Sequence, residues 1–342
     1  MIRTVLSVAF GTGIFAIATT SILGTQGPNQ DPLTPPLGLE VDKIPLAAST
    51  DALTADKVEL GKKLFFDERL SGTGKMSCST CHLHELGWTD GKKLSPKFDG
   101  NPNTRNTPTV YNVGYLEKLY WDGRAAGLEK NIVAAWKNQM GGKPEEVAKA
   151  LAAIPAYAKE FEKAYKAAPA EDTITKALAA FLRTLRSGNS PYDRFMSGKK
   201  DALDAKQKAG FDLFMGAAGC IVCHPPPLFT DRLFHITGVG LEGEKPDPGA
   251  GGEKALNDKA LVGAFKTPTL RGVAKTAPYF HDGGVADLKE AVKIMVGGGK
   301  AHARKDVLLQ DRKLSDEQVD QLVAFLGALT SDEKFTKPEL PK

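Results

Sequence analysis

The sequence predicts a mainly α-helical protein that consists of two similar domains in tandem. The pentapeptide CSTCH at residues 78–82 has a counterpart, CIVCH, at residues 220–224. GKKLF precedes the first pentapeptide at residues 61–65, and GFDLF precedes the second at residues 210–214. In both segments Leu and Phe have the spacing of residues on the buried face of a helix. A pentapeptide that recurred by chance would not carry matched flanks, so we interpret the two halves as an internal repeat.

A second pair of expected helices follows the pentapeptides. AFLRTL at residues 180–185 and AFLGAL at residues 324–329 each place apolar residues at helical intervals. Ser315 and Gln318 have the spacing of a capping box, which marks the start of the later helix. Each half is therefore expected to pack a helix from before its pentapeptide across a helix from near its end.

Composition limits the function classes only weakly, whereas the N-terminus indicates a location. The 342 residues carry 45 basic and 41 acidic side chains, a balance that does not indicate a nucleic-acid partner. Arg3 precedes an apolar run with small residues near its end, which is typical of a secretory signal; an uncleaved anchor is the alternative. We therefore expect a periplasmic protein. Its expected parts are a signal at 1–24, a Pro-rich linker at 25–50, an N-terminal domain at 51–198 and a C-terminal domain at 199–335.

The two pentapeptides have the pattern that attaches haem c. Their four cysteines are Cys78, Cys81, Cys220 and Cys223, and His82 and His224 follow directly. Two cysteines can form thioethers with the haem vinyl groups, and the adjacent histidine can bind the iron. A zinc site would leave both histidines unexplained, and a thiol redox pair would be expected between a strand and a helix. The pattern therefore predicts two covalently bound haems in two tandem cytochrome c-like domains.

The second axial ligand is expected to differ between the two haems. Met295 ends an amphipathic segment just before three glycines and could supply a thioether to the second haem, although a core methionine is the alternative. In the first domain His84 is too close to His82 to reach the other face, and Met140 is the remaining candidate. The first haem is therefore expected to have a face open to a small molecule such as peroxide.

From about Leu53 to Thr330 the chain resembles the bacterial di-haem cytochrome c peroxidases, a family that includes the MauG enzymes. The resemblance is carried by LGKKLFFDERLS, GWTDG, RNTPTVYN, YWDGRA and TPTLRGVAKTAPYFHDGG, together with both haem motifs. It implies that Met295 binds the second iron, where MauG-like enzymes have a tyrosine, and that Trp121 lies between the haems. It also implies a calcium ion at Asn106 and the carbonyls of Thr276 and Pro278, and contacts of Arg271 and His281 with haem propionates.

The chain departs from the family pattern in three ways. Phe98 stands about where peroxidases that need reductive activation have a distal histidine. The family pairs a glutamine with a glutamate ten residues later, whereas this chain has Glu129 and then Gln139. Either Glu129 takes over proton transfer to peroxide, or it is a solvated helix residue and the pocket has lost its acid. Val133 replaces a proline, and Trp136 is a wall of the pocket, a relay or a core residue.

Three functions remain open at this stage. The leading hypothesis is a peroxidase that reduces hydrogen peroxide at the first haem, with electrons from a small cytochrome c or cupredoxin through the second. The alternatives are a MauG-like oxidase of tryptophan or tyrosine in a partner protein and a di-haem electron carrier without catalysis. The resemblance also allows a homodimer.

Overall fold

The computed structural model describes residues 31, 33–40, 46–47, 49, 51–252 and 254–342. The predicted signal and most of the Pro-rich linker lie outside the described residues. Within the described part of the chain, no helix is long and apolar enough to cross a membrane.

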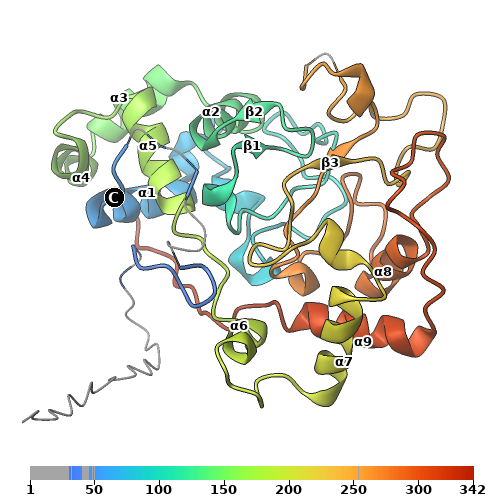
Figure 1. The fold of residues 1–342 in the computed structure, drawn as a ribbon. Coiled ribbons are helices and arrows are strands. Elements are labelled where there is room, and N and C mark those ends of the chain that lie inside the picture. The colour runs from blue at the N-terminus through green and yellow to red at the C-terminus, as the bar shows by residue number, and fades with distance from the viewer. Residues whose placement is uncertain (1–30, 32, 41–45, 48, 50, 253) are drawn as a thin grey trace, which may run out of the picture. The chain divides into compact units, whose positions relative to one another are not determined.

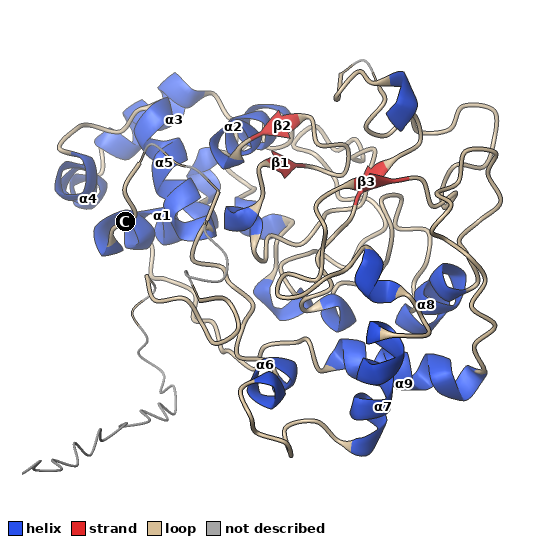
Figure 2. Ribbon diagram, in the orientation of Figure 1, coloured by secondary structure: helices blue, strands red, loops and turns tan. Residues whose placement is uncertain are grey.

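Helices dominate the described residues, as predicted, and the strands are short (Figure 2). The strands are β1 (Lys118–Leu119), β2 (Ala125–Ala126), β3 (Phe234–His235) and β4 (Phe265–Lys266), which form the antiparallel pairs β1–β2 and β3–β4. The helices are α1 (Ala55–Phe66), α2 (Leu128–Asn138), α3 (Pro144–Ala152), α4 (Pro155–Tyr165), α5 (Glu171–Leu182), α6 (Pro191–Met196), α7 (Ala205–Met215), α8 (Leu288–Val296) and α9 (Asp316–Gly327).

The same helix crossing occurs twice, once in each half of the chain. Helix α1 packs across α5, and α7 packs across α9 (Figure 1). A glycine lies at each crossing, and a Cβ added at Gly61 would lie 1.8 Å from the carbonyl oxygen of Ala177. A Cβ at Gly210 would lie 1.9 Å from the carbonyl oxygen of Gln321. The predicted repeat is therefore confirmed as a repeated close approach of two helix backbones.

Each half also has its own hydrophobic core. The first core extends from Val58 to Leu185 and contains Phe65, Trp88 and Phe181, whereas the second extends from Tyr192 to Leu329. This division corresponds to the two predicted haem domains. Helix α6 contributes Tyr192 to the second core, although it precedes the predicted boundary at residue 198.

The C-terminal segment after α9 returns to the first core. Phe335 stacks on Phe66, with ring centroids 5.6 Å apart, and forms a T-shaped pair with Trp88, with centroids 4.9 Å apart. The side chain of Arg69 donates to the carbonyl oxygen of Pro341. The C-terminus accordingly lies beside α1 in Figure 1. Nothing in the sequence pattern predicted that the last residues would complete the first core.

The helix crossing makes a testable prediction. Gly61→Ala should lower the free energy of unfolding by roughly 1–3 kcal/mol, because the new methyl group overlaps the backbone of α5. Gly327→Ala in α9 is the matched control: its Cβ would meet nothing within 4 Å, so alanine should be neutral or stabilise by up to about 1 kcal/mol. Denaturant unfolding of both variants measures the difference, and equal stabilities would contradict the close approach.

Candidate haem sites and the residues between them

Both axial histidines are held in the tautomer that an iron ligand needs. His82 donates from Nδ1 to the carbonyl oxygen of Trp88 at 2.9 Å, and His224 donates from Nδ1 to that of Phe229 at the same distance. The donation leaves Nε2 as the atom with a free lone pair. Burial lowers the pKa of both imidazoles, which keeps them neutral. Both side chains are therefore prepared to bind a metal.

The cysteines lie in two separate places and do not have the properties of reactive thiols. Burial raises the pKa of Cys78 to about 12 and that of Cys220 to about 11. A redox-active pair needs the opposite shift, because the thiolate is the nucleophile. Cys81 and Cys223 line different cavities, so the four sulfur atoms do not converge on one zinc ion. Covalent attachment of two haems is the chemistry that fits both pairs.

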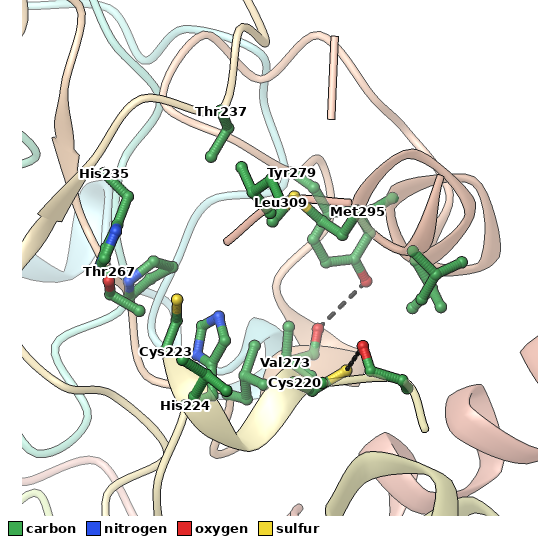
Figure 3. A pocket seen from close by; sticks show the side chains of 18 of the residues that line it. Cys220, Cys223, His224, His235, Thr237, Thr267, Val273, Tyr279, Met295 and Leu309 are labelled. Atoms are coloured by element: carbon green, nitrogen blue, oxygen red, sulfur yellow. Dashed lines mark hydrogen bonds between the residues drawn. The ribbon is translucent and has the colours of Figure 1, made fainter. Parts of the chain in front are cut away.

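The C-terminal cavity has a volume of about 230 Å³ and offers a ligand from each side. His224 enters it from the CIVCH turn, and Met295 enters from α8 on the other side (Figure 3). Asp287 caps α8 by accepting from the backbone N–H of Glu290, which fixes the start of the helix that carries Met295. The hydroxyl of Tyr279 donates to the carbonyl oxygen of Val273. On the side of the cavity across from His224, Met295 thus offers a thioether, which suits a haem iron.

The N-terminal cavity, about 140 Å³, has a different wall. Cys81 and His82 line it together with Asn131, Ala135 and Gln139 from α2 and its C-terminal end. Among its described lining residues, His82 is the only imidazole, and there is no methionine and no carboxylate. Met140 is buried in the first core and does not line the cavity. This cavity therefore offers one imidazole as an iron ligand and neutral amides, among them those of Asn131 and Gln139.

Glu129 and Phe98 do not line the N-terminal cavity. The carboxylate of Glu129 accepts from Nη2 of the buried Arg183 at 2.7 Å, and this ion pair accounts for its position. Phe98 is 39% exposed, and its backbone N–H donates to the carbonyl oxygen of Gln139. Of the two exchanged residues, the structure thus brings only Gln139 to the cavity.

The remaining departures on α2 have structural explanations. Trp136 is buried in the first core, and its indole N–H donates to the carbonyl oxygen of Leu70 at 2.7 Å. Val133 is partly buried and is not among the residues that line the cavity. Of the three alternatives for Trp136, the core role agrees with these contacts.

Trp121 lies between the two cavities and lines both of them. Its indole N–H donates to the carbonyl oxygen of Asn106 at 2.9 Å. Its own carbonyl oxygen accepts from the backbone N–H of Lys266 at 2.8 Å. Lys266 and Pro268 also line both cavities, and no sequence pattern singled them out. In the sequence these two residues lie on either side of Thr267, where the TPTLR segment begins.

Arg271 and His281, both expected near the second haem, have different surroundings. Arg271 is fully buried but does not line the cavity, because its guanidinium donates to Asp193 twice at 2.8 Å and to the carbonyl oxygens of Ser187 and Pro227. A propionate contact for Arg271 is therefore not supported, and the residue ties α6 to the TPTLR segment. His281 does line the cavity and stacks on Phe265.

His281 provides a test of whether this cavity fits a haem. Its Nε2 is buried and has no hydrogen-bond partner among the described residues. A buried polar nitrogen without a partner is costly unless a ligand supplies one. A haem bound between His224 and Met295 would bring polar propionates as well as its apolar ring, so the residues present fit this group.

Of the predicted calcium ligands, Asn106 is the one whose hydrogen bonds show how it is held. The side-chain amide nitrogen of Asn106 donates to the carbonyl oxygens of Lys92 and Lys93, which turns Oδ1 to the other side. Its backbone N–H donates to the carbonyl oxygen of His281 at 2.7 Å, so Asn106 is held against the segment that follows Thr276 and Pro278. Neutral oxygen donors of this kind suit calcium, and the ion remains a prediction.

Two haem sites in tandem cytochrome c-like domains define a di-haem c-type cytochrome. The sequence pattern of the family described as "Di-haem cytochrome c peroxidase" matches residues 55–201. The chain is 38% identical over 294 residues to the methylamine utilization protein MauG of Methylorubrum extorquens, covering 84% of this chain and 82% of that protein. It is 36% identical over 291 residues to the cytochrome c551 peroxidase of Nitrosomonas europaea, with 84% of each chain covered.

The solved structures agree with this assignment. The crystal structure of a MauG-like protein associated with microbial copper homeostasis superimposes with a TM-score of 0.77 at 30% identity. The match covers 87% of this chain and 93% of that protein. The chain belongs to the di-haem cytochrome c peroxidase family and is an oxidoreductase of that family.

The different positions of Glu129 and Gln139 can be tested with two variants. Glu129→Gln should leave the rate of reaction with peroxide within about twofold, since its carboxylate lies outside the cavity. Gln139→Glu should raise that rate by at least tenfold, because a carboxylate in the cavity can act as a general base, which typically contributes ~10²–10⁴-fold. Stopped-flow absorbance of the haem measures both rates. A large loss in Glu129→Gln at unchanged haem content would instead assign proton transfer to Glu129.

Proposed function

We propose that this protein reduces hydrogen peroxide to water at the first haem, with electrons that enter through the second haem from a small cytochrome c or cupredoxin. The observation that carries the proposal is the asymmetry of the two cavities. Met295 and His224 face one cavity from two sides, whereas His82 is the sole imidazole or thioether among the described lining residues of the other. One iron would be saturated for electron transfer and the other open for a substrate. The family and the predicted signal support a periplasmic location.

The protein side chains would position peroxide at the open face. When bound, the haem supplies the iron that exchanges electrons with peroxide. The amide of Gln139 can donate to one peroxide oxygen and accept from the peroxide O–H, which orients the molecule without a charge. Each peroxide accepts two electrons and two protons and yields two water molecules. Two donor molecules lose one electron each.

The protons must come from a source other than a carboxylate in this cavity. Its described lining contains Lys266, at the junction with the other cavity, and the arginines Arg105 and Arg124, which are both paired with acidic residues. Arginine keeps its proton at physiological pH, so neither residue is a useful acid or base. In this proposal water admitted to the cavity is the proton carrier, and Gln139 orients it. Cleavage of peroxide is accordingly expected to be slower than with a carboxylate in place.

Trp121 supports the electron path between the haems. Its indole lines both cavities, and its hydrogen bond to Asn106 fixes the ring there. An aromatic ring in this position shortens the gap that an electron must cross. A calcium ion at Asn106, Thr276 and Pro278 would stabilise the same junction, because Asn106 also supplies the carbonyl that holds the indole.

A MauG-like oxidase is the second candidate, and one observation favours it. The described lining of the cavity at His82 contains no carboxylate, so oxidising equivalents from peroxide could persist long enough to be passed to an aromatic side chain of a partner. The relatives named MauG and those named peroxidase are about equally similar to this chain. The presence of Met295 at the second cavity favours the peroxidase, since a methionine-bound haem is suited to accept electrons from a donor.

The central test is the addition of peroxide with and without a reduced small cytochrome. The peroxidase should oxidise two donor molecules for each peroxide consumed, over many turnovers, and show no partner-protein oxidation. A long-lived oxidised spectrum without donor, together with negligible donor turnover, would support the MauG-like function and overturn the proposal. No spectral response to peroxide would leave only an electron carrier and would overturn it as well.

Met295 makes a separate prediction about the second haem. Met295→Leu should remove the sulfur-to-iron absorption band and lower donor-dependent turnover at least tenfold, because the donor then faces a haem of lower potential. Reaction of the first haem with one equivalent of peroxide should continue. Met140→Leu is the matched control, since Met140 is a buried core residue outside both cavities. An unchanged band in Met295→Leu would remove Met295 as the ligand.

A further inference from the structure

Lys266 occupies a position that the proposed function does not explain. It lies in β4, opposite Phe234 of β3, and lines both cavities. Trp121 and Pro268 are the other described residues that line both. The neighbouring Thr267 can be followed in Figure 3, beside Cys223 and His235 at the wall of the C-terminal cavity. The backbone N–H of Lys266 donates to the carbonyl oxygen of Trp121, so the lysine is fixed to the residue between the cavities.

The ammonium group of Lys266 has no acidic partner in the described part of the chain. No described carboxylate lies within ion-pair distance of its Nζ, although Asp231 is near enough to influence it electrostatically. Burial lowers the pKa of Lys266 to about 8, which is the direction expected for a buried ammonium with too little compensating negative charge. Such a group is costly unless an anion completes its surroundings.

The other cations of the N-terminal cavity are already compensated. Arg105 contacts the carboxylates of Asp122 and Asp247, and Arg124 contacts Asp122. Among the described residues that line this cavity, Lys266 is therefore the one lysine or arginine without a carboxylate partner. On the other side, His235 is held between Asp231 and Asp306. Arg312 also lines the C-terminal cavity, and its side chain donates to the carbonyl oxygen of Leu308. Lys266 is thus the basic residue without a described carboxylate partner that lines both cavities.

Haem brings the anions that this junction lacks. Each haem carries two propionate carboxylates on the edge of the ring that is remote from its two thioethers. A lysine ammonium has three N–H donors that rotate freely, so it can serve acceptors on more than one side. Carboxylates that approach from two cavities would therefore find one common donor at Lys266.

We propose that Lys266 is a shared counter-ion, whose ammonium donates to a propionate of each haem and so links the reduction potentials of the two centres. Reduction of a ferric haem adds one negative charge, so a nearby cation favours the reduced state of both irons. Lys266 is a positioning residue in this role, and it does not touch peroxide. The inference rests on the two-haem part of the proposed function and is independent of peroxide reduction.

The test measures the two reduction potentials in the purified di-haem protein, without peroxide and without a donor. Lys266→Met should lower both potentials, so that the equilibrium constant for reduction of each haem falls about tenfold, which is ~59 mV for a one-electron couple. Lys266→Arg keeps the charge and should restore both potentials to near their original values. Lys200→Gln, which removes an exposed charge remote from the cavity linings, is the matched control and should change neither.

Two results would overturn the inference. Unchanged potentials in Lys266→Met, with both haems bound, would show that the ammonium is not a counter-ion to either. A change in only one potential would show that it is not shared. If Lys266→Met does not assemble, Lys266→Gln provides the same comparison with a polar neutral side chain. Because the potentials are measured without turnover, a failed peroxidase assay leaves this test intact, and the reverse is also true.

Discussion

A short series of hydrogen bonds across the junction holds the two halves of the site together. The carbonyl of His281, from the second half, accepts from the backbone N–H of Asn106 in the first. The carbonyl of Asn106 accepts from the indole of Trp121, and the carbonyl of Trp121 accepts from Lys266 of the second half. The series crosses between halves at its beginning and at its end. Trp121 and Lys266 consequently cannot move independently of either cavity.

The haem sites were predictable because their information is local. Five consecutive residues supply two thioethers and one axial ligand, and the turn that brings them together is a short 3-10 helix in both halves. The helix crossings were predictable from the repeated Gly and Leu-Phe spacing, and the Ser315–Gln318 capping box is present as predicted. Met295 could be selected from its place at the end of an amphipathic helix, and that helix does carry it to the second cavity.

The residues whose surroundings the sequence did not indicate have partners far away in the chain. The carboxylate of Glu129 accepts a hydrogen bond from Arg183, a residue 54 positions later. No local sequence pattern indicates that pairing. Arg271 is drawn to Asp193, 78 positions away, and so is not available to a propionate. Lys266 was overlooked because a single lysine in a short strand looks like an ordinary surface residue. Lys266 becomes a candidate functional residue only once the structure shows that it lines both cavities.

The packing of Phe335 against Trp88 makes the first haem site depend on a segment that follows the second core. Trp88 supplies the carbonyl that orients His82, and its indole is covered by the aromatic ring of Phe335. Phe335 follows α9, which packs against α7 as part of the second core. A disturbance of the second half can therefore reach the axial histidine of the first half through this ring contact, by a route separate from the junction at Trp121.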